Sequence, residues 1–257
     1  MNGSKIVACI EARMGSSRLP GKVLMEIDGK PTLQILIERL EKLKLIDQII
    51  IAATTNPLDE KIEELGEELG IFVYRGSEDD VLGRVVNAVE AVSGDIIVEI
   101  TGDCTLMDPE VVESVIKKYL EGGYDYVTNI GYVDEQVREI PIGMDVRVFS
   151  YNDLKQISEL TNDPEDREHV SLYFFRDGKN KYRLYNLPVP EKWKRDYKVR
   201  IALDTKEDFE FIKNVYTGLS KQKENFNLED ILNFLDDNKN LLEINSDVVQ
   251  KTVTNLE

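Results

Sequence analysis

An alternation of short apolar runs with helical periodicities over the first hundred residues constrains the fold more than any other feature of this sequence. Four runs rich in Val and Ile have the length and composition of buried strands, and they cover 5–10, 48–53, 71–74 and 95–100. Between them, apolar residues recur at helical spacing. This order predicts an α/β fold with a doubly wound, mostly parallel sheet. Ligands of such sheets bind beyond the carboxyl ends of the strands, which here are followed by the loops 11–22, 54–57, 75–84 and 101–109.

The second half of the chain is less regular. Strands are expected over 124–129, 144–149, 181–185 and 197–203. Helices are expected over 151–160, 165–176, 206–219 and 227–236. No Pro/Gly/Ser-rich linker interrupts the chain, so we expect a single domain over 1–257, in which an α+β extension follows the first half. The polar tail from Asn238 onward is expected to be loosely held.

The charge balance excludes several classes of partner. The chain has 32 Lys and Arg against 49 Asp and Glu, a formal net charge of −17. Phosphates of nucleic acids require a basic face, and anionic membranes attract basic segments, so neither is an expected partner. No apolar run has the length of a membrane span, and residues 1–5 lack a signal-peptide pattern. We therefore expect a cytoplasmic protein.

Few side chains of this sequence suit a zinc site or a thiol nucleophile. Its cysteines are Cys9 and Cys104, and its single histidine is His169. Any metal is therefore expected to be held by carboxylate oxygens, which suits magnesium, with manganese as the alternative.

The segment 11–22 concentrates positive charge directly after the first predicted strand. Three basic residues fall within ten positions, and they are Arg13, Arg18 and Lys22. Gly15 and Gly21 allow backbone N–H groups to approach an anion closely, so the loop is expected to bind a polyphosphate. It is not a Walker A loop, because five residues separate these glycines and Val23 replaces the hydroxyl residue. The G-x-G-x-x-G fingerprint of dinucleotide-binding proteins is also absent.

Five further motifs follow the loop in order. They are Ala53-Thr-Thr-Asn56, Arg75-Gly-Ser-Glu-Asp-Asp-Val-Leu-Gly-Arg84, Thr101-Gly-Asp-Cys-Thr-Leu-Met-Asp-Pro109, Arg167-Glu-His-Val170 and Leu203-Asp-Thr205. With the loop Ala12-Arg13-x-Gly15-Ser-x-Arg18-x-Pro20-Gly21-Lys22, they resemble the sugar-acid cytidylyltransferases that activate acylneuraminate and 3-deoxy-manno-octulosonate. The spore-coat polysaccharide biosynthesis protein F branch is the most similar. The resemblance covers about residues 5–217 and implies a nucleotide-diphospho-sugar transferase (GT-A-like) fold.

The resemblance also implies how the chain is divided between its ligands. Residues 1–123 correspond to the nucleotide-binding half, 124–220 to the acceptor and dimerisation half, and 221–257 to a C-terminal helical tail. A homodimer is expected through the middle segment, whose aromatic residues suit an interface core. These are Tyr124, Tyr126, Tyr132, Phe149, Tyr173, Phe174, Phe175 and Trp193.

Individual residues take roles by the same resemblance. Arg13 and Lys22 are expected to be catalytic, and both are expected to be exposed in the empty protein. The expected metal ligands are Asp103 and Asp204. The acceptor-binding residues are Asp145, Arg147, Arg167 and His169. The nucleotide-binding residues are Glu11, Ala12, Gly15, Ser16, Arg18, Thr55, Asn56, Asp80, Arg84 and Thr101.

Three aspartates are also interpreted from their local sequence. Asp103 directly follows the strand 95–100, which suits a metal ligand. Asp108 precedes Pro109 and a helical periodicity, so we interpret it as a helix N-cap. Asp204 either faces the metal or caps the helix 206–219, and the two are compatible.

Two further positions are interpreted near predicted helix starts. His169, at the start of the helix 165–176, is expected to contact the acceptor without serving as the essential base. Asp79 or Ser77 is expected to cap the helix 80–92, and Arg84, one turn into it, to face the phosphates.

Two departures from the family pattern affect the substrates. Relatives commonly have Gln where this chain has Glu11, and an acceptor-only carboxylate near the base suits guanine better than cytosine. CTP is therefore the first expectation and GTP the second. Relatives also tend to read Pro-Asp-Gly-Leu-Asp-Val-Glu where this chain reads Pro141-Ile-Gly-Met-Asp-Val-Arg147. The gain of positive charge favours an acceptor with a phosphate or a carboxylate.

We expect a nucleotidyltransferase that forms a nucleotide-activated sugar and releases pyrophosphate, for surface glycan assembly. One alternative is a sugar-1-phosphate guanylyltransferase. Another is a regulatory subunit that binds nucleotide without turnover, although Lys22, Asp103 and Asp204 are then unexplained. An ordinary glycosyltransferase is the third, but the expected D-x-D pair at the strand end is absent from Thr101-Gly-Asp-Cys-Thr105.

Overall fold

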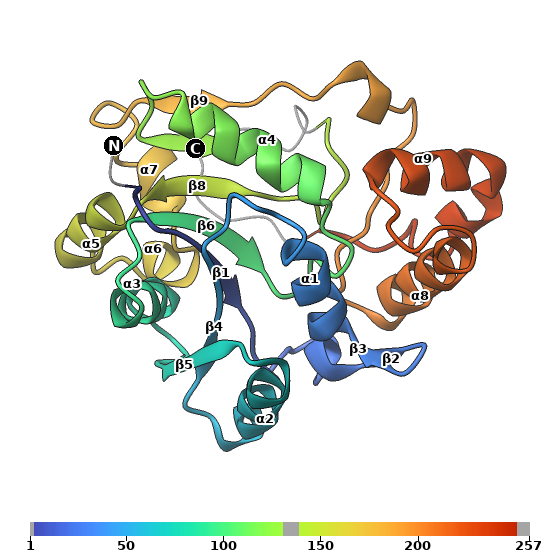
Figure 1. Cartoon of the computed structure of the whole chain (residues 1–257), viewed down its shortest axis with the longest axis horizontal. Coiled ribbons are helices and arrows are strands. Elements are labelled where there is room, and N and C mark those ends of the chain that lie inside the picture. The colour runs from blue at the N-terminus through green and yellow to red at the C-terminus, as the bar shows by residue number, and fades with distance from the viewer. Residues whose placement is uncertain (1–2, 131–138, 251–257) are drawn as a thin grey trace.

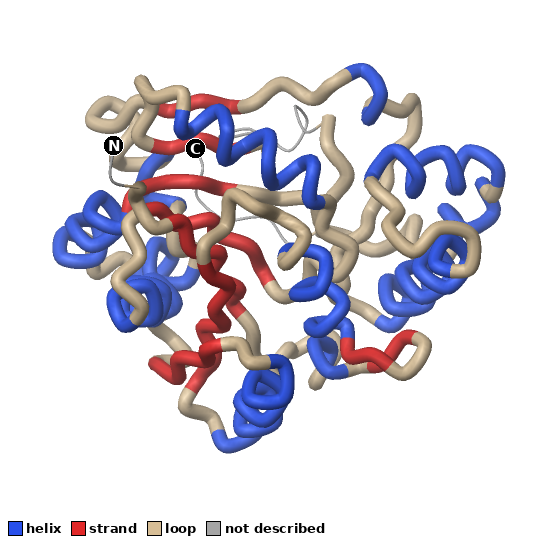
Figure 2. Tube along the Cα trace, in the orientation of Figure 1, coloured by secondary structure: helices blue, strands red, loops and turns tan. Residues whose placement is uncertain are grey.

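A central sheet organises the computed structural model, which describes residues 3–130 and 139–250. Among these residues the sheet has seven strands in the order β5-β4-β1-β6-β8-β7-β9, shown in Figures 1 and 2. The strands are β1 Ile6–Glu11, β4 Gln48–Thr54, β5 Phe72–Gly76, β6 Ile96–Thr101, β7 Tyr126–Thr128, β8 Arg147–Ser150 and β9 Leu184–Asn186. A small hairpin, β2 Glu26–Ile27 and β3 Lys30–Pro31, stands apart from it.

The sheet changes direction in the middle. Strands β5, β4, β1 and β6 are parallel, as the strand and helix alternation predicts. Strand β8 then pairs with β6 in the antiparallel sense, so that Glu99 lies opposite Arg147. Strand β7 is antiparallel to β8, and β9 is parallel to β7. The predicted α/β fold with a mostly parallel sheet is confirmed.

Helices cover both faces of the sheet (Figure 1). One face packs α1 Thr32–Leu40, α2 Glu60–Leu69 and α4 Pro109–Leu120, and α8 Lys206–Ser220 and α9 Leu228–Asp237 extend the same apolar cluster. The other face packs α3 Val81–Ala91, α5 Tyr151–Leu160, α6 Pro164–Glu168 and α7 Leu172–Phe175. Short 3₁₀ helices cover Lys22–Leu24, Pro57–Asp59, Glu191–Trp193 and Lys239–Glu243.

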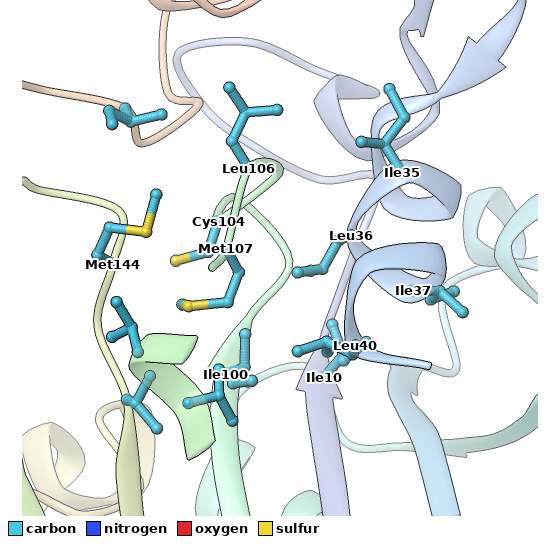
Figure 3. Packing of buried hydrophobic residues seen from close by; sticks show 14 of the residues in the cluster. Ile10, Ile35, Leu36, Ile37, Leu40, Ile100, Cys104, Leu106, Met107 and Met144 are labelled. Carbon is cyan, nitrogen blue, oxygen red and sulfur yellow. The ribbon is translucent and has the colours of Figure 1, made fainter. Parts of the chain in front are cut away.

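The core on the first face lies directly beneath the carboxyl ends of the strands. Figure 3 shows Leu36 and Leu40 of α1 facing Ile10 of β1 and Ile100 of β6. The chain beyond β6 fills the same layer with Cys104, Leu106 and Met107, all buried. The loop that follows β6 is therefore fixed by its own apolar side chains, which gives its polar residues a rigid support.

Two predicted elements are wrong. The segment 197–203 forms no strand and makes only an isolated parallel bridge, from Ile142 to Arg200. This segment pairs with a loop instead of a strand, and the N–H of Leu203 donates to Asp103 O. The predicted helix 165–176 is broken between α6 and α7, where Val170 has a φ of +42°.

The C-terminal tail is held more firmly than its polar composition predicts. Leu241, Leu242 and Ile244 pack against the core, and the side chain of Asn245 is buried and hydrogen-bonded. Residues 251–257 lie outside the described residues. None of the helices in 3–130 and 139–250 combines the length and the apolar character that a membrane crossing requires.

The aromatic residues of the segment 124–195 are mostly interior. Tyr126, Phe149 and Phe174 are fully buried and contact one another across the second face of the sheet. Trp193 is buried as well, and Tyr132 lies outside the described residues. The prediction that these aromatic residues form an interface core is therefore wrong for those that are buried in the core of the chain itself.

Candidate active site

A cavity of about 420 Å³ opens at the carboxyl ends of β1 and β6, where the parallel sheet predicts a ligand site. Its volume suits a small organic ligand. The predicted site residues that line it are Glu11, Ala12, Arg13, Ser16, Arg18, Lys22, Arg84, Thr101, Asp103, Asp145, Arg147, His169 and Asp204. The structure thus gathers residues from both halves of the chain around one cleft.

The glycine-rich loop forms one wall of this cleft and is closed on itself. The N–H groups of Ser16 and Gly21 both donate to Met14 O at 2.9 Å. Gly21 has a φ of +73°, a conformation that favours glycine. The loop is anchored by Asp59, whose Oδ1 accepts the N–H of Met14 at 2.8 Å and whose Oδ2 accepts the hydroxyl of Thr54 at 2.6 Å. Sequence reasoning missed this buried anchor, because nothing in its local pattern distinguishes it.

Lys22, at the end of the loop, joins the two predicted metal ligands. Its Nζ lies 3.3 Å from Asp103 Oδ2 and 2.9 Å from Asp204 Oδ1. The expectation that Lys22 is exposed is wrong, because its side chain is only 14% exposed, whereas Arg13 is 43% exposed. Burial acts to lower the pKa of Lys22, but the two carboxylates together raise it above its ordinary value.

Asp204 is surrounded by positive charge. Its Oδ2 lies 2.9 Å from Arg18 Nη2 and 2.6 Å from Arg200 Nη2. Burial acts to raise the pKa of this carboxyl, but Lys22, followed by Arg18 and Arg200, holds it below its ordinary value. Asp204 is therefore ionised at neutral pH.

The carboxylates of Asp103 and Asp204 fit a divalent cation. The ammonium of Lys22 already lies between them, so this position accepts a positive charge. The described residues contain no cluster of three or more His, Cys, Asp or Glu side chains that suits a metal. A site with two carboxylates matches magnesium, which commonly takes its remaining ligands from substrate phosphates and water.

The inner end of the cleft contains a buried charge cluster that sequence reasoning identified only in part. Glu11 of β1 and Glu99 of β6 stand on neighbouring strands, and Glu99 Oε1 lies 3.3 Å from Arg147 Nη1 of β8. Burial, reinforced by the charge of Glu99, raises the pKa of Glu11 to about 8. Glu99 was missed, although a charged residue inside an apolar strand was a usable signal.

Arg147 is not the free cation that its sequence context suggests. Besides Glu99, it has Asp145 Oδ2 at 4.0 Å, and burial opposes but does not outweigh the carboxylates that raise the pKa of the guanidinium. Its charge is therefore already balanced inside the protein. The inference from residue 147 to an anionic acceptor loses its main support.

Some predicted site residues lie elsewhere in the described chain. Asp80 is the N-cap of α3, accepts the N–H of Gly83 at 2.8 Å and holds Arg167 at 3.2 Å. The predicted caps Asp79 and Ser77 are therefore wrong. Asn56 caps the turn before α2, as its Asn-Pro sequence predicts, and accepts the N–H of Leu58.

Thr55, Asn56, Asp80 and Arg167 are all outside the cavity lining. Thr55 donates its N–H to Gly76 O. Gly15 is an exposed part of the loop beside Glu78, which a Cβ at this position would approach to 3.1 Å.

Arg84 and His169 both line the cleft, and their surroundings differ. The guanidinium of Arg84 donates to the carbonyl oxygens of Ser77 and Glu78, so it supports the loop before α3. His169 ends α6 rather than starting a helix. Burial lowers its pKa, which keeps the imidazole neutral at pH 7.

The capping residues near the metal-ligand candidates are settled by the structure. Asp108 caps α4, as predicted, and accepts the N–H of Glu110 at 2.6 Å. It also accepts the N–H of Leu228, at the start of α9. Helix α8 is capped by Thr205 in a capping box with Asp208, so the alternative that Asp204 is this cap is wrong.

Comparison with known proteins identifies the family. Residues 7–246 match the family model described as cytidylyltransferase. The chain belongs to the cytidylyltransferase family. Among its relatives, the spore coat polysaccharide biosynthesis protein SpsF of Bacillus subtilis is 35% identical over 216 residues, 82% of this chain and 86% of that protein. The uncharacterized protein MJ1063 of Methanocaldococcus jannaschii is 37% identical over 255 residues, 98% of this chain and 99% of that protein.

A solved structure has a fold similar to that of this member of the cytidylyltransferase family. A cytidylyltransferase from Leptospira borgpetersenii superposes with a TM-score of 0.85 at 27% identity, covering 97% of this chain and 100% of the other. The predicted nucleotidyltransferase fold is thereby confirmed.

Proposed function

We propose that this protein transfers the cytidylyl group of CTP to a sugar acid or a sugar phosphate and releases pyrophosphate. The observation that carries the proposal is the placement of Lys22 between Asp103 and Asp204 at the end of a closed glycine-rich loop. The chain belongs to a cytidylyltransferase family. In such an enzyme, the positive charge of Lys22 suits a triphosphate, and the negative charges of the two carboxylates suit a divalent cation.

In the proposed reaction, an acceptor oxygen attacks the α-phosphorus of CTP, and the bond to the β-phosphate oxygen breaks. Two anions must meet, so the protein acts mainly by neutralising charge and by alignment. Arg13, Arg18 and Lys22 hold the triphosphate, and backbone N–H groups of the glycine-rich loop donate further hydrogen bonds to it. When bound by Asp103 and Asp204, Mg²⁺ supplies further charge stabilisation to the phosphate oxygens.

The choice of CTP over GTP is supported by Glu11. The case for GTP depends on an ionised carboxylate at this position, which accepts hydrogen bonds only. A pKa of about 8 leaves most of the Glu11 side chain protonated at pH 7, and a neutral carboxyl group both donates and accepts. The family model agrees with CTP.

We propose that the acceptor enters the inner end of the cleft, beside Asp145, Arg147 and His169, in the part of the chain that follows residue 123. Residues 1–123 would then bind the nucleotide, and the C-terminal segment from residue 221, as far as it is described, would support them. The relationship to a spore coat polysaccharide biosynthesis protein supports a role in surface glycan assembly.

A pyrophosphate-release screen tests the proposal. The purified protein is incubated with each of the four nucleoside triphosphates, with Mg²⁺ and with a panel of sugar acids and sugar 1-phosphates. We expect release with CTP and at least one acceptor. Release with GTP alone would establish the guanylyltransferase alternative, and CTP binding without any release would favour the non-catalytic subunit.

Substitutions in the cleft make this test specific. Asp103→Asn keeps the shape but removes one charge, so turnover should fall by at least about 10². Lys22→Ala and Arg13→Ala should each lower it by roughly 10² to 10³. The matched control is Asp237→Asn, at an exposed position at the end of α9. Near-full turnover of Asp103→Asn would contradict the site.

Metal removal gives a second test of the same site. EDTA should abolish turnover, and Mg²⁺ or Mn²⁺ should restore it, because the candidate ligands are carboxylate oxygens. Restoration by Zn²⁺ alone would contradict this assignment.

A further inference from the structure

The three cations around Asp204 come from two different segments of the chain. Lys22 and Arg18 belong to the glycine-rich loop, and the proposed function moves both onto the triphosphate. Lys22 contacts Oδ1 at 2.9 Å, whereas Arg18 and Arg200 contact Oδ2 at 2.9 and 2.6 Å. Arg200 precedes Asp204 by four residues in the chain and does not belong to this loop. Once a nucleotide is bound, only Arg200 of these three remains available to Asp204.

Arg200 is fixed by a fully buried carboxylate. Its side chain is 7% exposed, and its Nε and Nη2 donate to Asp208 Oδ1 and Oδ2 at 2.9 and 3.2 Å. The same carboxylate accepts the backbone N–H groups of Asp204 and Thr205 at 3.0 and 3.1 Å. Asp208 therefore sets both the backbone of Asp204 and the guanidinium that contacts its side chain.

The end of the described chain completes this arrangement. We name residues 245–250 the C-terminal strap. The side chain of Asn245 is 5% exposed, and its Nδ2 donates to Arg200 O at 3.1 Å and to Asp208 Oδ1 at 2.9 Å. One buried amide thus supports both members of the Arg200–Asp208 pair, so their geometry depends on the position of the strap.

The far end of the strap reaches the cleft itself. Gln250 lines the cavity, and its Oε1 accepts a hydrogen bond from Arg200 Nη1. The carbonyl oxygen of Val249 lies 3.4 Å from Arg18 Nη1. The strap therefore contacts both guanidinium groups that occupy Asp204 Oδ2.

We propose that Arg200, held by Asp208 and by Asn245 of the C-terminal strap, is a positioning residue that occupies Asp204 Oδ2 and presents Oδ1 to the divalent cation. This inference rests on the proposed function, because it requires Asp204 to face a metal and a triphosphate. A group that orients a ligand carboxylate in this way acts on metal affinity without touching the metal. Lys22 and Arg18 can then leave Asp204 for the triphosphate, while Arg200 retains the orientation of the Asp204 carboxylate.

Manganese binding tests the role of Arg200 directly. Electron paramagnetic resonance measures free Mn²⁺ in the presence of the full-length protein and of a CTP analogue with a non-cleavable α,β-methylene bridge. Arg200→Lys keeps the charge but cannot contact both Asp208 oxygens and Asp204, so Mn²⁺ affinity should fall roughly 10- to 100-fold. Asn245→Ala, outside the cleft, should weaken it by about three- to tenfold. Arg195→Lys is the matched control, because Arg195 pairs with Asp236 away from the cleft.

A structural role alone would not change the metal dependence of turnover. For Arg200→Lys and Asn245→Ala we expect a raised Mg²⁺ requirement, with turnover recovering toward the wild-type rate at high Mg²⁺. Unchanged Mn²⁺ affinity and Mg²⁺ requirement in variants that melt near the wild-type temperature would overturn the inference. Absence of Mn²⁺ and analogue binding by the wild-type protein would instead overturn the proposed function.

A crystal structure of the wild-type protein with Mg²⁺ and the analogue tests the inference without any variant. We expect Arg200 to remain within hydrogen-bond distance of Asp204 Oδ2 while Lys22 moves to the phosphates and Oδ1 faces the metal. Release of Arg200 from Asp204, or metal on Oδ2, would overturn the proposal even where Arg200→Lys fails to fold.

Discussion

At the scale of single residues, the buried carboxyl of Glu11 makes the stability of the protein depend on pH. Its pKa is raised from 4.5 to about 8 by burial and by Glu99. The fold therefore favours the protonated form, so this contribution to stability is complete below about pH 4.5 and is lost as the pH rises through about 8. The loss is at most about 1.4 kcal/mol for each pH unit in that window.

Glu11→Gln removes this titration while it keeps the shape of a neutral carboxyl. We expect the variant to gain stability relative to the wild type between pH 5 and pH 8.5, as measured by urea unfolding at several pH values. Glu64→Gln, at an exposed position of α2, is the control and should show no such trend. A stability difference for Glu11→Gln that is constant over this pH range would contradict the raised pKa.

Residues that reach the cleft because they lie in loops after strand ends could be predicted from the sequence. Lys22 and Asp103 follow β1 and β6 closely, and a parallel sheet brings such loops together. Asp59 and Asn245 could not be predicted as site residues, because they act on Met14 and Arg200, which lie 45 residues away in the chain in both cases. Their local patterns are those of an ordinary helix start and a polar tail.

At the scale of elements, Asp108 joins the starts of two helices. From the sequence alone, Asp108→Asn is expected to be nearly silent, since Asn caps helices about as well as Asp. In the structure, however, one oxygen accepts the N–H of Glu110 in α4 and the other accepts the N–H of Leu228 in α9. An amide NH₂ would face one of these donors.

We therefore expect Asp108→Asn to lower the free energy of unfolding by about 1–3 kcal/mol without changing CTP affinity. Chemical unfolding and nucleotide titration measure the two effects. Asp163→Asn is the control, because Asp163 is an exposed N-cap of α6 and should change stability little. A stability unchanged in Asp108→Asn would show that the contact with α9 is unimportant.

The loop before β8 depends on a close approach at Gly143. Its φ is +97°, and a Cβ there would lie 2.6 Å from the backbone nitrogen of Ala202. The neighbouring bridge from Ile142 to Arg200 holds the segment that leads to Asp204. A side chain at Gly143 would therefore push two backbone segments apart, because the atoms that it meets belong to the backbone and not to a flexible side chain.

Gly143→Ala should lower the free energy of unfolding by about 1–3 kcal/mol more than Gly122→Ala. Gly122 is a matched control, because its φ is also positive at +81° but a Cβ there has nothing within 4 Å. Thermal melting of the two variants measures the difference. Equal melting temperatures would show that the cost comes from the backbone conformation alone.

The break between α6 and α7 shows why some element boundaries escape sequence analysis. Residues 165–176 have a continuous helical pattern, yet Val170 adopts a φ of +42°, which a β-branched residue rarely takes. Its side chain is buried in the cluster of the second sheet face. Tertiary packing, which the local pattern does not contain, determines this turn and places His169 beside the cleft.

At the scale of the whole molecule, we propose a homodimer, although most of the aromatic residues that suggested an interface are in the core. The proposal now depends on the family resemblance, and β9 offers an edge strand of the sheet in the same region. Light scattering should give twice the chain mass of 29.4 kDa. Because each chain has a net charge of −17, added salt should strengthen the association. A mass of one chain at all salt concentrations would contradict it.

The contact between Arg18 and Val249 joins positions that are 231 residues apart, and this separation has a consequence during biosynthesis. A ribosome adds about 5–20 residues per second, so the glycine-rich loop emerges roughly 10 to 50 seconds before the strap. The parallel strands β1, β4, β5 and β6 all precede residue 102 and can pair during that interval. A nascent chain therefore forms these parallel strands early, while the environment of Asp204 is assembled only after the strap has been translated.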